Sequence, residues 1–200
     1  MRKKTLITLS LVLFCITGSY AQIAEKAEDI SPLLIGETIP QDIAAAINTN
    51  KKNLATVLKD KPSVILFYRG GWCPYCNRHL SAIGEAEKAI LELGYQVIGI
   101  SPDTEKGLNA SVRKNKLNYM LFSDADGKLA KAMGIAFKAP EKYKNLLLKS
   151  SNGENKGFLP VPSVFVVDTK GVILFEYVSP DYKERISAAL LTGVLKALKP

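Results

Sequence analysis

Two apolar runs with a helical pattern between them restrict the folds open to this chain. Residues 62–68, PSVILFY, and residues 95–101, YQVIGIS, are continuous apolar runs of strand length. Between them, residues 73–94 place apolar side chains at helical spacing and end at Gly94, a good helix stop. Runs of this kind are typical of strands buried on both faces of a sheet. The pattern therefore predicts two parallel strands connected by a helix that packs across them.

The neighbouring segments extend this plan to one α/β domain with a central mixed sheet flanked by helices. Residues 118–124 predict another strand, and residues 162–168 and 172–178 predict a hairpin closed by a short turn. A Lys-rich helix and then a polar loop are expected over residues 137–160. A short helix is also expected at residues 54–60, a helix capped by Asp103 or Thr104 at 102–116, a turn and short helix at 125–134, and an amphipathic helix at 182–198.

The first 21 residues have the character of a secretory signal peptide. They begin with a positive stretch, continue with an apolar run and end with small residues: Arg2, Lys3 and Lys4, then Leu6 to Ile16, then Ser19 and Ala21. A membrane anchor is the alternative, but the apolar run is shorter than the roughly 20 residues that span a bilayer. We therefore expect residues 1–21 to be cleaved off, leaving one domain over residues 22–200 without a stable membrane span. We expect this domain to be exported, either to the periplasm or out of the cell.

The charge of the chain argues against a nucleic-acid partner. The formal net charge is +8, which arises from 27 basic and 19 acidic residues. The basic residues beyond the signal peptide are spread over the expected helices and loops, and they form no stripe with aromatic residues between them. We expect an ordinary solvated basic surface.

The cysteines give the first indication of chemistry. Of the three cysteines, Cys15 leaves with the signal peptide, so that Cys73 and Cys76 remain. A structural zinc site uses four Cys or His ligands, and His79 is the only histidine of the chain. A disulfide across two intervening residues closes a small loop and restricts the unfolded chain only slightly. We therefore predict a redox pair that an oxidising compartment can store as a disulfide, with no metal and no cofactor.

The position of the pair suggests how it works. Cys73 opens the predicted helix, where unpaired N–H groups and the helix dipole favour a thiolate over a thiol. Pro74 suits the first turn because its missing N–H costs nothing there. Cys76 follows three residues later, so one helical turn brings the two sulfur atoms together. The spacing predicts that Cys73 attacks a substrate and that Cys76 resolves the product as a disulfide.

Several neighbours of the pair are candidates for supporting roles. Trp72 is expected to form an apolar rim for docking partners, with simple packing as the alternative. Tyr75 lies between the two cysteines and is expected to be exposed. Three charged or titratable neighbours are expected to point to solvent and not toward the thiols: Arg69, Arg78 and His79. Tyr143 and Phe158, in the 137–160 segment, are expected to pack within their loop and not to cover the site.

The stretch FYRGGWCPYC, residues 67–76, resembles the thioredoxin-fold superfamily, in which W-C-x-x-C follows the central strand. Its C-P-Y-C portion is similar to the glutaredoxin motif. Segments outside this stretch resemble the AhpC/TSA branch, which contains the peroxiredoxins and their relatives: IGETIP (35–40), ISPDT (100–104), LFSDADGKLAKAMGI (121–135) and VPSVFVVDTKGVILF (161–175). The resemblance covers residues 31–198 and implies a thioredoxin-like fold.

This chain departs from the peroxiredoxin pattern at three supporting positions. On the motif P-x-x-x-T-x-x-C, Leu66 stands at the proline position and Gly70 at the threonine position. Val161 and Pro162 stand where the resemblance implies an arginine. Pro162 instead resembles the thioredoxin proline, usually cis, that lies against the redox pair, and a strand-start proline is the alternative. Thioredoxins also carry a buried aspartate on the strand before the motif, where SVILFY has no acidic residue.

The resemblance leads to two functional hypotheses that share a fold and a nucleophile. The first is a peroxiredoxin-like antioxidant enzyme, in which Cys73 attacks a hydroperoxide, Cys76 resolves the product, and a dithiol donor resets the pair. The donor is a thioredoxin-like protein or a small thiol. The alternative is a thioredoxin-like reductase of protein disulfides, and a third hypothesis is a binding module whose thiols have no role. Four residues are expected to contact the substrate: Trp72, Pro74, Tyr75 and Pro162.

Overall fold

The computed structural model of the protein describes residues 23–40, 46–47 and 54–198. The strands in this part are β1 (Ala46–Ile47), β2 (Ser63–Phe67), β3 (Gln96–Ser101), β4 (Met120–Ser123), β5 (Ala136–Lys138), β6 (Phe158–Pro160), β7 (Ser163–Val167) and β8 (Ile173–Val178). The α-helices are α1 (Leu54–Asp60), α2 (Pro74–Glu92), α3 (Glu105–Asn115), α4 (Lys128–Ala132), α5 (Lys144–Ser150) and α6 (Ala188–Leu198). Two short 3-10 helices are η1 (Ala27–Asp29) and η2 (Glu141–Tyr143).

Two of the sequence-based expectations concern the division of the chain. The signal peptide predicted over residues 1–21 lies outside the described residues, and the single domain over 22–200 stays a prediction. Within the part that the structure describes, no helix has both the length and the apolar character required to cross a bilayer.

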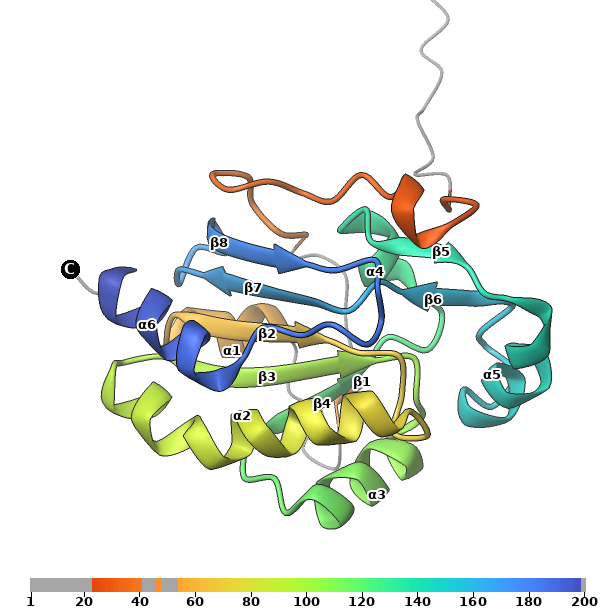
Figure 1. Ribbon diagram of the computed structural model, residues 1–200, viewed down its shortest axis with the longest axis horizontal. Coiled ribbons are helices and arrows are strands. Elements are labelled where there is room, and N and C mark those ends of the chain that lie inside the picture. The colour runs from red at the N-terminus through yellow and green to blue at the C-terminus, as the bar shows by residue number, and fades with distance from the viewer. Residues whose placement is uncertain (1–22, 41–45, 48–53, 199–200) are drawn as a thin grey trace, which may run out of the picture.

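The central sheet is mixed, and the helices flank it (Figure 1). Its strands follow the order β1-β4-β3-β2-β7-β8. β2 pairs in parallel with β3, and β3 pairs in parallel with β4, whereas β1, β7 and β8 join by antiparallel pairing. This arrangement confirms the predicted α/β class, the parallel strand–helix–strand unit and the hairpin of β7 and β8.

Side chains of β2 alternate between two hydrophobic cores, one on each face of the sheet. Val64 and Leu66 pack with residues of α2, α3 and α6, and Figure 1 shows these three helices on one face. Ile65 and Phe67 pack with residues of α1 and α4 on the other face. Every residue of β2 is buried, which explains why the apolar run in the sequence is continuous.

Helix α2 carries the two cysteines at its N-terminus. Cys73 is the N-cap residue and Pro74 is the first helical residue, as the sequence predicts. The helix buries an apolar stripe against the sheet, made of Leu80, Ile83 and Ile90. Burial of each of these side chains contributes about 1.5–3 kcal/mol to stability. Gly94 follows the helix with a φ of +90°, a conformation that glycine adopts without strain.

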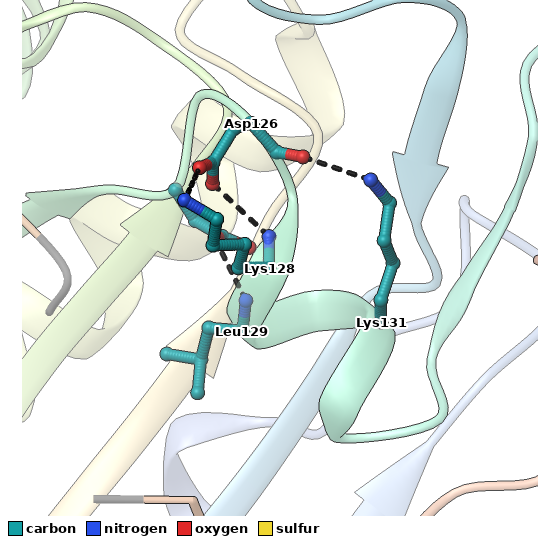
Figure 2. Close-up of polar contacts among 5 residues, drawn as sticks. Asp126, Lys128, Leu129 and Lys131 are labelled. Carbon is teal, nitrogen blue, oxygen red and sulfur yellow. Dashed lines mark hydrogen bonds and ion pairs between the residues drawn. The ribbon is translucent and has the colours of Figure 1, made fainter. Parts of the chain in front are cut away.

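Two aspartates hold the turn before α4, and Figure 2 shows the contacts of one of them, Asp126. Asp124 is buried, and its Oδ1 accepts a 2.9 Å hydrogen bond from the backbone N–H of Leu129. Asp126 accepts a 3.1 Å hydrogen bond from the backbone N–H of Lys128 and pairs with its Nζ at 2.7 Å. Lys131 Nζ donates to the backbone carbonyl of Asp126 at 2.9 Å. These contacts satisfy polar groups at the start of α4, so both acids have a structural role here.

Two features of the C-terminal half differ from the sequence-based expectation. Within the 137–160 segment, the Lys-rich helix is α5, but β5 and β6 also pair as a small antiparallel sheet. Each of these strands has three residues, too few to show a periodic pattern. Helix α6 begins at Ala188, later than predicted, because residues 179–187 form an irregular connection, in which Arg185 contacts Cys76.

Candidate active site

Cys73 and Cys76 lie together in the first turn of α2. Both are free thiols, and their exposed fractions are 1% and 0%. Cys73 is the N-cap residue, and its carbonyl accepts a 3.1 Å hydrogen bond from the backbone N–H of Asn77. The structure therefore brings the predicted pair together at the helix N-terminus. Neither sulfur is open to solvent in the reduced state.

The pKa values of the two thiols are shifted in opposite directions. A hydrogen bond from the Cys76 thiol lowers the pKa of Cys73 to about 6, against the opposing effect of burial. The backbone N–H of Cys76 and the guanidinium groups of Arg69 and Arg185 also favour this thiolate. The pKa of Cys76 is raised by its hydrogen bond to Cys73 and by burial. At neutral pH, Cys73 is therefore the thiolate, and Cys76 holds the proton.

Arg69 does not point to solvent, so this expectation is wrong. Its exposed fraction is 4%, and its Nε is buried without a hydrogen-bond partner among the described residues. Its guanidinium carbon lies near the centroids of three aromatic rings, 5.1 Å from Trp72, 4.9 Å from Tyr143 and 4.3 Å from Tyr182. The three rings come from separate segments and stabilise the buried cation by cation–π contacts.

Arg78 and His79 contribute less to the charge of the site. Arg78 is exposed, as expected, and its guanidinium lies 4.7 Å from the ring centroid of Tyr75. His79 is half-buried, so its predicted exposure is wrong in part. Burial and the charge of Arg185 lower the pKa of His79 to about 4. His79 is therefore neutral at physiological pH.

Arg185 is a site residue that the sequence did not single out. Its Nη2 donates to Cys76 Sγ at 3.8 Å, and its Nη1 donates to the backbone carbonyl of Glu184 at 2.6 Å. It belongs to the 179–187 connection, of which the sequence predicts residues 182–187 as part of a helix. No local pattern marks this residue, because a contact over 109 positions depends on the packing of α6 against α2.

The aromatic residues near the pair pack against one another. Trp72 is half-buried, and its ring lies 5.3 Å from that of Tyr143 with a tilt of 34°. Tyr143 therefore packs against the residue next to Cys73, and not only within its own loop as expected. Tyr75 is half-buried instead of exposed, because it meets Tyr182 edge to face at 5.5 Å. Phe158 packs in the core on the α1 and α4 face, so it does not cover the thiols, as expected.

Pro162 lines a pocket of about 320 Å³ beside the cluster of aromatic rings. The same pocket is lined by Arg69, Tyr143, Tyr182 and Phe137, among others. The described residues contain no cis peptide bond, so Pro162 differs from the thioredoxin proline in this respect. Pro74, by contrast, is exposed at the helix start.

A buried aspartate holds the loop before Cys73. The backbone N–H of Gly71 donates a 2.7 Å hydrogen bond to Oδ2 of Asp103, and the Ser101 hydroxyl approaches the same oxygen at 3.3 Å. Burial raises the pKa of Asp103 to about 6, against the opposing effect of these hydrogen bonds. Strand β2 carries no acidic residue. The buried carboxylate of this site is that of Asp103, in the segment after β3.

The chain is similar in sequence to known proteins. The AhpC/TSA family matches the chain over residues 35–175. The chain belongs to the AhpC/TSA family. Among the relatives of this AhpC/TSA protein, chloroplastic peroxiredoxin Q from Suaeda salsa is 26% identical over 164 residues, 76% of this chain and 69% of that protein. A putative peroxiredoxin bcp from Haemophilus influenzae is 29% identical over 107 residues, 53% of this chain and 68% of that protein.

Solved structures confirm the thioredoxin-like fold of this AhpC/TSA protein. Peroxidoxin BcpB from Mycobacterium tuberculosis has a TM-score of 0.66 at 21% identity, covering 83% of this chain and 98% of that one. Peroxiredoxin Q from Xanthomonas campestris has a TM-score of 0.66 at 17% identity, covering 83% of this chain and 99% of that one.

A threonine at position 70, where the peroxiredoxin motif has one, would clash with its neighbours in this AhpC/TSA protein. Gly70 has a φ of +139°, and a Cβ atom there would lie 2.3 Å from Nε1 of Trp72 and 2.9 Å from Oδ1 of Asp103. The cations near the pair are Arg69 and Arg185, instead of an arginine at residues 161–162. Within the described residues, no group of three His, Cys, Asp or Glu side chains is arranged to hold a metal ion.

Proposed function

We propose that this AhpC/TSA protein is a thiol peroxidase that reduces hydroperoxides, with Cys73 as the attacking thiolate and Cys76 as the resolving thiol. The lowered pKa of Cys73 carries the proposal, because the thiolate is the species that attacks a peroxide. The relatives are named peroxiredoxins, which favours this function over the alternative of a reductase of protein disulfides.

The first step breaks the O–O bond of the hydroperoxide. The Cys73 thiolate attacks one oxygen and becomes a sulfenic acid, while the other oxygen takes up a proton and leaves as an alcohol or water. The Cys76 sulfur then bonds to the Cys73 sulfur, and the sulfenic oxygen leaves as water. A dithiol donor restores both thiols through a mixed disulfide.

The residues proposed to contact the substrate or the donor surround the pair: Trp72, Pro74, Tyr75 and Pro162. Exposure of Pro74 and partial exposure of Trp72 and Tyr75 support this assignment, because they are the accessible surface next to two buried sulfur atoms. Pro162 is included because it lines the pocket beside Arg69. Since both sulfur atoms are buried, side chains packed around them have to shift before a substrate reaches Cys73.

The donor is proposed to be a thioredoxin-like protein or a small thiol, acting outside the cytoplasm. Export, to the periplasm or beyond, is supported by the charge and apolar pattern of residues 1–21. N-terminal sequencing of the protein isolated from its native cells tests this point. A mature chain that begins at Gln22 is expected, and a chain that retains Met1 would contradict export by cleavage.

Trp72 allows a direct test, because it is the only tryptophan of the chain and adjoins Cys73. Reduced protein is mixed in a stopped-flow instrument with hydrogen peroxide and, separately, with a small model disulfide. The fluorescence change with peroxide is expected to be far faster than the oxidation of free cysteine. Cys73→Ser should abolish it, whereas Cys76→Ser should keep the first step and form no intramolecular disulfide. A peroxide rate no faster than that of free cysteine, or a faster response to the disulfide, would refute the proposal.

A further inference from the structure

The guanidinium of Arg185 lies at the sulfur of the buried thiol. Its Nη2 donates to Cys76 Sγ at 3.8 Å, while Nη1 is bonded to the backbone carbonyl of Glu184. Among the residues described, no carboxylate forms an ion pair with Arg185. The positive charge of Arg185 is therefore not neutralised by an acid, and it acts on the adjacent sulfur.

Cys76 has to lose its proton in the resolving step, when Cys73 is no longer a thiolate. In the reduced pair, Cys76 donates a hydrogen bond to the Cys73 thiolate, and this bond together with burial raises the pKa of Cys76. Once Cys73 carries a sulfenic oxygen, the negative charge on its sulfur is gone. Cys76 must then ionise with none of its surface exposed. A thiolate in such a place is unfavourable unless a cation or an N–H group stabilises it.

The groups around Cys76 come from several parts of the chain. The backbone N–H of Arg69 and the charge of Arg185 both favour the thiolate. Tyr68 adjoins Cys76 as well, but burial raises the pKa of its hydroxyl, so that it stays neutral. His79 is also neutral, because burial and Arg185 lower its pKa to about 4. Within the described residues, Arg185 is thus the cationic side chain in contact with the Cys76 sulfur.

We propose that Arg185 is a further catalytic residue, which stabilises the thiolate of Cys76 during the resolving step. This inference rests on the proposed function. In the step, the Cys76 thiolate forms the S–S bond to Cys73 as the S–O bond of the sulfenic acid breaks. The leaving hydroxide takes up the proton that Cys76 released and departs as water. The same contact stabilises Cys76 as the leaving group when a donor thiolate attacks Cys73.

Such a role has a characteristic dependence on pH. Arg185→Met is expected to raise the pKa of Cys76 by roughly one unit, which lowers its thiolate fraction about tenfold at neutral pH. A more basic thiolate is also a better nucleophile, so the resolving rate falls only about threefold there. At a pH above the pKa of Cys76 in both the wild type and the variant, Arg185→Met is expected to form the disulfide about threefold faster than the wild type. A merely structural role would slow the step at every pH.

The resolving step is measured by Trp72 fluorescence as the phase whose rate does not depend on peroxide concentration. Its pH profile is expected to shift upward by roughly one unit in Arg185→Met and by less in Arg185→Lys, which retains the charge. Lys183→Met is the matched control, because it removes an exposed charge from the same connection and should leave the profile unchanged. An unchanged profile in Arg185→Met, or equal slowing at all pH values, would overturn the inference.

A measurement without peroxide separates this inference from the proposed function. In the Cys73→Ser background, the rate of Cys76 alkylation by iodoacetamide is followed against pH, with and without Arg185→Met. The midpoint is expected to rise by roughly one pH unit when Arg185 is replaced. An unchanged midpoint overturns the role of Arg185 alone. A wild type that does not react with peroxide overturns the proposed function and leaves the alkylation result standing.

Discussion

The guanidinium of Arg69 lies 4.3 Å from the ring centroid of Tyr182, so the loop before the cysteines meets the connection before α6. Trp72 and Tyr143 lie against the same guanidinium. A buried cation loses its hydration, and the three rings offset part of that loss. Because the side chain is buried, its charge is screened less than that of a surface arginine, and it helps to lower the pKa of Cys73.

Replacing Arg69 by methionine is expected to raise the pKa of Cys73 by roughly one unit, because one of the charges that favour the thiolate is lost. The pH profile of Cys73 alkylation by iodoacetamide, measured in a Cys76→Ser background, is the readout. Arg78→Met serves as the control, since Arg78 is exposed and packs on Tyr75. Identical profiles for Arg69→Met and its parent would show that Arg69 has no influence on the thiolate.

Restoring the threonine of the family motif is expected to harm the protein. In Gly70→Thr, the new side chain would meet Trp72 Nε1 at 2.3 Å and would sit at a φ of +139°, so a destabilisation of more than about 2 kcal/mol is expected. Gly94→Thr is the matched control, because Gly94 also has a positive φ but no atom within 4 Å of the added Cβ. Urea denaturation compares the two, and equal losses of stability would contradict the clash.

The stability of the reduced protein is expected to rise with pH between about 6 and 9. The pKa of Cys73 falls from 9.0 to about 6 on folding, so its contribution is fully present above 9.0 and is lost as the pH falls through 6. The free energy of unfolding, relative to that of Cys73→Ser, should therefore increase by at most about 1.4 kcal/mol per pH unit. Urea denaturation under reducing conditions measures it. A constant difference across this range would show that folding does not lower the pKa of Cys73.

Asp103 is expected to give a pH dependence of opposite sign at lower pH. Its pKa rises from 3.8 to about 6 on folding, so the folded state holds the proton more tightly and loses stability as the pH rises through this window. Asp103→Asn removes this ionisation and keeps an oxygen that can accept from Gly71. Burial also raises the pKa of Asp124 to about 6, so both acids lower the stability in this window. In urea denaturation, the loss between pH 4 and 6 should become smaller in Asp103→Asn, by at most about 1.4 kcal/mol per unit, and should be unchanged in the exposed control Asp60→Asn.

Much of the fold and the position of the pair were predictable because they depend on residues close in sequence. The continuous apolar run of β2 and the helical spacing after Cys73 predict a buried strand followed by a helix. Pro74 and Gly94 mark the two ends of that helix. Three-residue strands such as β5 and β6 were missed, because so short a stretch has no period.

Local pattern was sufficient to place two sulfur atoms one helical turn apart at a helix N-terminus, since three intervening peptide bonds govern that distance. The surroundings of those atoms were decided by packing between distant segments. Arg69 is buried because Tyr143 and Tyr182 close over it, and Arg185 reaches Cys76 because the last helix packs on α2. Such contacts depend on how whole helices and loops fill the space around the sheet, and no spacing along the chain encodes that.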